Sequence, residues 1–151
     1  MNQSPSIHAS AVLVGARAVL IQGPSGSGKS RLALALLHAA AQGGLIPFAR
    51  LVADDRAHVE ASHGRLLVRP VDALAGLIEV RGLGIRRVCH EPLAVVGLLM
   101  ELGQAEPERL PDPTRRQAEI AGITLPRLAV AAGVDPLPLL LAELQTADGT
   151  G

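Results

Sequence analysis

The chain has 151 residues, with 14 basic and 14 acidic side chains and therefore no formal net charge. This length suits one domain with a proper core and is too short for two ordinary domains. Balanced charge and a single aromatic residue, Phe48, argue against nucleic-acid binding and against attachment to an anionic membrane, because those functions use a basic field or stacking rings.

Two further features indicate a cytoplasmic protein. Cys89 is the only cysteine, which excludes an internal disulfide and is typical of a reducing compartment. Residues 32–49 are long and apolar enough to resemble a membrane span, but polar residues and helix breakers such as His38, Gly43 and Pro47 interrupt them. We therefore expect no membrane segment, and the polar N-terminus has no pattern of a signal peptide.

The first predicted elements are two short strands joined by a tight turn. Residues 11–14 and 17–22 are apolar runs around Gly15 and Ala16, which favours a hairpin. The second run leads directly into residues 23–30, which match the phosphate-binding pattern G-x-x-x-x-G-K-[ST]. Residues 31–42 are rich in Leu and Ala and end before a glycine pair, so they predict a helix against the sheet.

A strand, a glycine-rich loop and a helix in this order form a phosphate cradle, because backbone N–H groups and the positive end of the helix face the same point. Lys29, the only lysine in the chain, would reach the β and γ phosphates, and the Ser30 hydroxyl would hold Mg²⁺. We therefore predict ATP and Mg²⁺ as cofactors. The residues predicted to bind the nucleotide are Gly23, Pro24, Ser25, Gly26, Ser27, Gly28, Lys29 and Ser30.

Further along, residues 50–55 form an apolar strand that ends in Asp54 and Asp55. Residues 57–61 and 65–69 predict a second hairpin with Gly64 in its turn. Residues 71–78 are consistent with either a helical turn or a bent connector. The next segment, 79–85, combines charged residues with two glycines.

The last third of the chain alternates short apolar runs with polar connections. Residues 93–102 predict a strand, and the Pro-rich residues 103–116 predict an exposed loop. Residues 123–125 and 128–130 predict two short strands separated by Pro126. Residues 138–146 predict a C-terminal helix, so that residues 1–146 form one domain and residues 147–151 a flexible tail.

Five residues outside the loop are candidates for chemistry. Asp54 and Asp55 end a strand beside the predicted phosphate site, where a carboxylate can hold Mg²⁺ or accept a proton, although a solvated turn has the same pattern. From spacing alone, Glu79 could equally pair with Arg81. His8 and Arg109 could equally be ordinary surface residues.

A resemblance to a known family separates these alternatives. His8 with the strands after it, the loop at 23–30, the sequence L-V-A-D-D at 51–55 and above all E-V-R-G-L-G-I at 79–85 resemble the catalytic domain of HPr kinase/phosphorylase. That family carries E-[IV]-R-G-L-G-I after an L-[IV]-A-D-D strand end. The resemblance implies an α/β P-loop fold of the HPr kinase and phosphoenolpyruvate carboxykinase type, a mixed sheet with few helices, in a short form that has the catalytic domain alone.

The same resemblance implies a serine kinase that uses ATP and Mg²⁺ to phosphorylate an HPr-like phosphocarrier protein of the phosphotransferase system. It also implies the reverse phosphorolysis and a homo-oligomer, expected to be a hexamer. By this resemblance Asp55 is the acid/base carboxylate, Lys29 binds phosphate, and His8 and Arg109 complete the catalytic set. Glu79 and Ser30 are implied as Mg²⁺ ligands, and Asp54 is a further candidate on position.

Two other functions are compatible with the same residues. An ATPase or small-molecule kinase of this fold would turn over ATP without a carrier protein. A nucleotide-binding regulator would need Lys29 but not Asp55.

Overall fold

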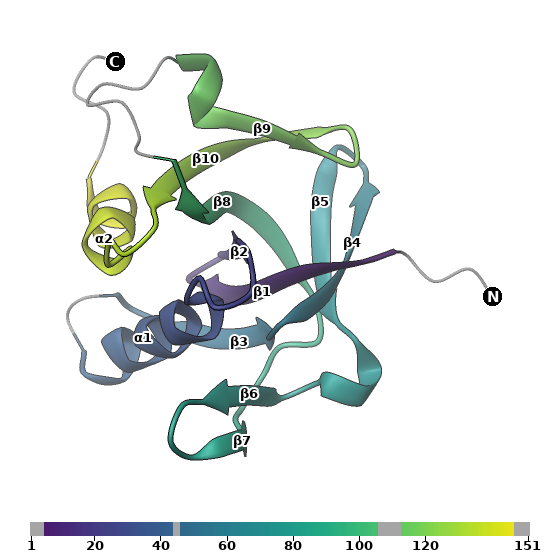
Figure 1. Cartoon of the computed structure of the whole chain (residues 1–151). Coiled ribbons are helices and arrows are strands. Elements are labelled where there is room, and N and C mark those ends of the chain that lie inside the picture. Colours follow the sequence, from purple (N-terminus) through teal and green to yellow (C-terminus); the bar gives the residue numbers. More distant parts are fainter. Residues whose placement is uncertain (1–4, 44–45, 106–112, 147–151) are drawn as a thin grey trace.

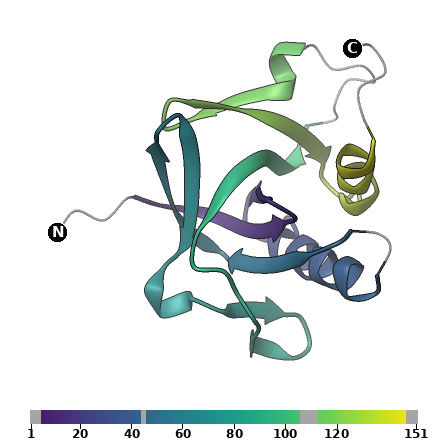
Figure 2. The same cartoon turned by 180° about the vertical axis from the view of Figure 1, so that it is seen from behind.

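The computed structural model describes residues 5–43, 46–105 and 113–146, and Figures 1 and 2 show it from opposite sides. In the described residues the chain forms ten strands and two α-helices, together with two 3₁₀ turns. The strands are β1 Ser6–Val14, β2 Arg17–Gln22, β3 Ala49–Ala53, β4 Arg56–Ser62, β5 Arg65–Pro70, β6 Leu77–Val80, β7 Gly84–Arg87, β8 Ala94–Gln104, β9 Gln117–Ile120 and β10 Ile123–Ala131. The helices are α1 Lys29–Ala41 and α2 Leu137–Gln145, and the turns are η1 Asp72–Leu74 and η2 Pro113–Arg116.

Eight strands form one mixed sheet. Strand β2 lies between β1, which is antiparallel to it, and β8, which is parallel to it. Beyond β1 lies β3, and beyond β8 lies the parallel strand β10. Strands β4 and β5 connect the far ends of β1 and β8, so the sheet curls back on itself (Figure 1). This arrangement confirms the α/β fold and the mixed sheet with few helices.

The curled sheet has a hydrophobic core on each face. On one face α1 packs its buried positions Leu32, Ala33 and Leu36 against Val12, Ile21 and other residues of the sheet. The other face encloses a second cluster that includes Leu20, Val68 and Leu99. Because β1 and β2 contribute to both clusters, the strands that carry the phosphate-binding loop are fixed from two sides.

Strand β1 is longer than the sequence pattern predicted. It begins at Ser6 instead of Ala11, so His8 lies within the strand. The reason is visible in the alternation of residues 7–12, where Ile7, Ala9 and Ala11 belong to one core while Val12 belongs to the other. The polar residues between them concealed this alternation.

Residues 79–85 contribute to a hairpin, β6 and β7, that the sequence did not predict. Gly82 and Gly84 adopt φ values of 90° and 89° at its turn, a left-handed conformation that glycine adopts without steric cost. All four residues of β7 are exposed. A strand without a buried face has no hydrophobic periodicity, which explains why the pattern was missed.

The prediction of two short strands around Pro126 was wrong, because Ile123–Ala131 is one strand. Its first part, up to Pro126, pairs with β9, and its second part, from Arg127, pairs with β8. Proline has no N–H to donate, and here it occupies the point where the strand changes partner. Strand β9 itself was not predicted.

The remaining predictions lie close to the observed elements. The helix predicted at residues 31–42 spans Lys29–Ala41, and the second hairpin and the strand at 93–102 are present. Arg109 and the tail at 147–151 lie outside the described residues. No helix in the described part of the chain has the length and apolarity needed to cross a membrane.

Candidate active site

The glycine-rich loop connects the end of β2 to the start of α1, as its sequence predicted. Gly26 and Gly28 adopt φ values of 80° and 101°, which keep the loop tight enough for its N–H groups to converge. Ser27 N–H donates a hydrogen bond of 3.0 Å to the Pro24 carbonyl. The first N–H groups of α1 have no partners within the helix, so this end of α1 is suited to an anion.

Two glycines allow the loop to pack against the end of β8. A Cβ atom at Gly23 would lie 2.5 Å from Ser27 Oγ and 3.0 Å from the Leu102 carbonyl oxygen. A Cβ atom at Gly103 would lie 3.1 Å from Cδ of Pro24. Larger residues at these positions would push the loop away from β8, so both glycines set its position.

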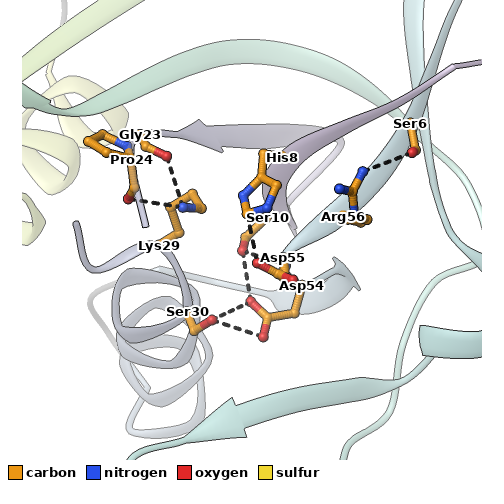
Figure 3. A network of polar contacts seen from close by, with 10 residues as sticks. All are labelled: Ser6, His8, Ser10, Gly23, Pro24, Lys29, Ser30, Asp54, Asp55 and Arg56. Atoms are coloured by element: carbon orange, nitrogen blue, oxygen red, sulfur yellow. Dashed lines mark hydrogen bonds and ion pairs between the residues drawn. The ribbon is translucent and has the colours of Figure 1, made fainter. Parts of the chain in front are cut away.

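Lys29 closes the loop in this structure. Its side chain is buried, and Nζ donates hydrogen bonds of 2.9 Å to the Gly23 carbonyl and 3.2 Å to the Pro24 carbonyl (Figure 3). An ammonium group in this position has to exchange these carbonyls for phosphate oxygens when an anion binds. The loop itself therefore compensates the charge of Lys29.

Asp54 is the centre of the polar network beside the loop. Its carboxylate is buried, with the residue 6% exposed, and it accepts hydrogen bonds from three directions. Ser30 Oγ lies 2.7 Å from Oδ1 and 2.9 Å from Oδ2, and the Glu79 N–H donates to Oδ2 at 3.1 Å. Ser10 Oγ donates to Oδ1 at 2.7 Å. Asp54 thus connects β3 to β1 and to α1 (Figure 3), and through the Glu79 N–H it also connects β3 to β6.

Ser10 is a site residue that the sequence analysis missed. It is fully buried in β1, and its hydroxyl also accepts a hydrogen bond of 3.2 Å from the backbone N–H of Asp55. One side chain therefore contacts the carboxylate of Asp54 and the backbone of Asp55. The signal that could have revealed it is its place, with His8, on the face of β1 opposite Ile7, Ala9 and Ala11.

Asp55 has the opposite environment from its neighbour. Its side chain is 61% exposed, and its backbone adopts a φ of 69°, which is uncommon for a residue other than glycine. Hydrogen bonds on both sides stabilise this turn, from Arg56 N–H to the Asp54 carbonyl at 2.8 Å and from Ala9 N–H to the Asp55 carbonyl at 3.1 Å. Asp55 Oδ1 lies 3.8 Å from Nδ1 of His8 (Figure 3).

Glu79 reaches the network through its backbone, while its side chain is exposed. In the part of the chain that the structure describes, no ion pair joins it to Arg81, the partner that spacing alone suggested. The structure therefore brings His8, Lys29, Ser30, Asp54, Asp55 and the backbone of Glu79 to one edge of the sheet. Arg109 lies outside the described residues.

The donors at this edge fit a magnesium ion bound together with phosphates. Mg²⁺ in nucleotide sites takes one or two carboxylates, while phosphate oxygens and water complete an octahedron. Ser30 and Asp54 supply a hydroxyl and a carboxylate within hydrogen-bonding distance of each other. Within the described ranges, no three His, Cys, Asp or Glu side chains form a cluster that could hold a metal ion by themselves.

Comparisons with known proteins identify the family of this chain. The model of the HPr Serine kinase C-terminal domain matches residues 1–91, a stretch that contains every one of these residues except Arg109. The HPr kinase/phosphorylase proteins of two strains of Streptococcus thermophilus are each 33% identical over 136 residues, which is 83% of this chain. The chain spans only 41% of the length of these relatives.

A solved structure supports the same relationship over the whole fold. The Hpr(Ser) kinase/phosphatase from Coxiella burnetii superimposes with a TM-score of 0.71 and 27% sequence identity, and the match covers 93% of each chain. Because the family model matches more than half of the sequence and the fold matches from end to end, the chain belongs to the HPr serine kinase C-terminal domain family.

Proposed function

We propose that this chain is a kinase that transfers the γ-phosphate of ATP to a serine hydroxyl of an HPr-like phosphocarrier protein. The observation that carries the proposal is the pair Asp54 and Asp55 beside a phosphate-binding loop. One carboxylate is buried against Ser30, and the other is exposed to an incoming substrate. Phosphoryl transfer needs both a group that organises the phosphates and a group that accepts the hydroxyl proton.

The loop and Lys29 bind the triphosphate in this proposal. Backbone N–H groups of residues 23–30 and the N-terminus of α1 face the phosphates, and Lys29 leaves the carbonyls of Gly23 and Pro24 to contact the β and γ oxygens. These interactions hold the γ-phosphate in one orientation, which favours in-line attack.

The hydroxyl of Ser30 and the carboxylate of Asp54 would hold Mg²⁺ together with the phosphates, and Glu79 is the further ligand candidate from β6. The bound cation would neutralise charge that builds up on the phosphate oxygens. The hydrogen bond from Ser10 keeps Asp54 turned toward Ser30. The two oxygen ligands proposed for Mg²⁺ are therefore in place before the nucleotide binds.

Asp55 accepts the proton. As the serine oxygen forms its bond to the γ-phosphorus and ADP leaves, the hydroxyl proton passes to the Asp55 carboxylate. In the reverse direction, an oxygen of inorganic phosphate attacks the phosphorus of the phosphoserine and the bond from phosphorus to the serine oxygen breaks. Asp55 returns its proton to the departing serine oxygen, and pyrophosphate is the product. His8, 3.8 Å from Asp55, orients this carboxylate. The exposure of Asp55 allows a substrate as large as a protein to reach it.

The proposal also assigns Arg109 to the catalytic set, a homo-oligomer of six chains as the assembly, and the cytoplasm as the compartment. Support for these comes from family membership and, for the compartment, from a single cysteine in the chain. Size-exclusion chromatography with light scattering measures the assembly directly.

The test is to incubate the purified chain with ATP, Mg²⁺ and the host's own phosphocarrier proteins, and to follow each carrier by mass spectrometry. We expect one phosphate on a serine of one carrier, and no product with Asp55→Asn. Asp72→Asn, which changes an exposed aspartate of η1, is the matched control and should behave as wild type. Labelling of no carrier, or equal labelling by Asp55→Asn, would contradict the proposal.

A further inference from the structure

The two flanks of the phosphate-binding loop differ in composition. Strand β2, which leads into the loop, has β1 and then β3 on one side, and β8 and then β10 on the other. Among the described residues, the proposed catalytic and metal-binding side chains outside the loop and α1 are His8 on β1, Asp54 and Asp55 after β3, and Glu79 on β6. None of them comes from β8 or β10. The second flank is built from parallel strands, and ligands of α/β proteins bind at the carboxyl ends of such strands.

A cavity of about 260 Å³ lies at that end of β8 and β10. Its lining comes from three stretches: residues 24–27 of the loop, residues 102–103 at the end of β8, and residues 130–134 at the end of β10 and in the turn after it. The loop therefore forms one wall of this cavity. Gly103 makes this arrangement possible, because a Cβ atom there would crowd Pro24 at 3.1 Å.

The position of the catalytic carboxylate sets the direction of a bound nucleotide. If the γ-phosphate faces Asp55 on the β1 and β3 side, the α-phosphate and the nucleoside lie at the other end of the phosphate chain. Strand β2, which leads into the loop, lies between β1 and β8, so the loop lies between Asp55, which follows β3, and the cavity at β8 and β10. The direction away from Asp55 therefore leads toward β8 and β10.

We propose that this cavity binds the base and ribose of the nucleoside triphosphate. The inference rests on the proposed function, since that function supplies the triphosphate and the place of its γ end. Apolar contact with the base comes from Leu102, Val130 and Val134, and the hydroxyl of Ser25 lies on the same lining. Small-molecule sites typically combine such apolar side chains with polar groups that fix the orientation of the ligand.

The cavity also predicts weak selectivity among bases. The only aromatic residue of the chain, Phe48, contacts Arg50 at 5.2 Å and is not part of the lining. Two N–H groups of the β10 turn are engaged within the protein, Ala132 with the Gln104 carbonyl and Val134 with the Ala131 carbonyl. With neither a stacking ring nor these donors free, we expect ATP and GTP to bind within about tenfold of each other.

The experiment separates the nucleoside from the phosphates by measuring binding of ATP and of inorganic tripolyphosphate, each with Mg²⁺, by isothermal titration calorimetry. Ala132→Phe adds a ring to an exposed position of the lining. We expect it to weaken ATP at least about tenfold and to leave tripolyphosphate unchanged. Val134→Phe, at a position that is 58% exposed, is a second variant with the same expectation. Ala142→Phe, on an exposed position of α2, is the matched control.

The outcomes distinguish this inference from the kinase proposal. Unchanged ATP affinity in both lining variants overturns the nucleoside site and leaves the kinase proposal intact. Equal weakening of ATP and tripolyphosphate binding in folded protein has the same meaning. The lining variants lose affinity for ATP and keep it for tripolyphosphate if the nucleoside site is correct. If the wild-type chain at the same time labels no carrier, this result supports the nucleoside site and contradicts the kinase proposal. Unchanged tripolyphosphate binding also shows that a variant is folded.

Discussion

On the β1 and β3 side of the loop, Asp54 accepts hydrogen bonds from two serines and a backbone N–H, and Asp55 is held in a left-handed turn. On the β8 and β10 side, a cavity of about 260 Å³ is lined by small and aliphatic residues together with Ser25 and Ser27. The first side is rich in directional contacts, which fix the positions of reacting groups within tight limits. The second side provides a cavity, and few hydrogen bonds between side chains surround it.

This difference suggests a division of labour around one loop. Groups that handle charge and protons need fixed geometry, so they lie where several elements can contact one carboxylate. Groups that hold a nucleoside need volume and apolar surface. Substitutions of single residues on the two sides of the loop test this division.

Asp55→Asn tests the exposed half of the carboxylate pair. Because Asn tolerates a positive φ and the side chain is exposed, we expect the free energy of unfolding to stay within about 0.5 kcal/mol of wild type. Loss of the proton acceptor should reduce kcat by roughly 10²- to 10⁴-fold. Carrier phosphorylation measures the rate, and urea unfolding measures the stability. A variant that keeps wild-type kcat would remove Asp55 from the mechanism.

Asp54→Asn tests the buried half and should affect stability as well as activity. Donors from Ser10, Ser30 and the Glu79 backbone converge on this carboxylate, and an Asn side chain offers one oxygen where Asp offers two. If the Asn oxygen faces the Glu79 N–H, its NH₂ group faces the serine hydroxyls, which then have to accept instead of donate. The bonds also lose the carboxylate charge, so the variant should lose about 1–3 kcal/mol of folding stability.

The same variant should need a higher Mg²⁺ concentration for half-maximal activity, because it also loses a charged ligand candidate. Urea unfolding and a Mg²⁺ titration of carrier phosphorylation give the two values. Equal stability of Asp54→Asn and Asp55→Asn would show that the contrast between the two carboxylates is wrong.

Ser10→Ala tests the residue that connects the two carboxylates. Removing the hydroxyl takes one of two donors from Oδ1 of Asp54, which keeps its bond from Ser30, and it removes the acceptor of the Asp55 N–H. Both carboxylates therefore lose alignment. We expect kcat to fall about tenfold with a smaller change in KM for ATP, because the loop itself is untouched.

Ser10→Thr retains the hydroxyl and should recover part of this loss, whereas Ser6→Ala, an exposed serine of the same strand, should have no effect. Steady-state kinetics with a carrier protein provides the comparison. If Ser10→Ala and Ser10→Thr lose activity equally, bulk at this position matters and the hydrogen bonds do not.

Gly103→Ala tests the packing of the loop on β8 and has the smallest expected effect. Gly103 and Gly64 both have left-handed backbones, with φ of 68° and 77°, but only Gly103 has neighbours near its missing Cβ. Both variants should lose about 1 kcal/mol of stability through backbone strain.

Only Gly103→Ala should also weaken ATP binding, by a few-fold, through displacement of Pro24. Calorimetry of ATP binding to the two variants measures the difference. Equal affinities would show that the loop does not depend on this contact.

Much of the site was readable from the chain because its signals are local. The loop at 23–30 carries its own glycines, its lysine and the helix that follows, and the pattern needs no distant partner. Asp54 and Asp55 were recognisable as the end of an apolar strand. Local sequence, however, could not separate their roles, since both residues are the same type at adjacent positions.

Other features depended on contacts between distant parts of the chain. Ser10 and Asp54 are 44 positions apart, and only the pairing of β1 with β3 brings them together. The continuity of β10 through Pro126 depended on two different partner strands. Ile78 is the only residue of β6 that is buried outright, so its hairpin had too little periodicity to be recognised.

The sequence by itself determined the position and conformation of the glycine-rich loop between β2 and α1, because this conformation follows from residues that are neighbours in the chain. The tertiary structure decided which aspartate is buried and which is exposed, that Ser10 joins them, and that a cavity opens on the opposite flank. Each of those outcomes depends on which strands lie side by side. Hydrogen bonds and burial form between surfaces that meet only in the folded chain.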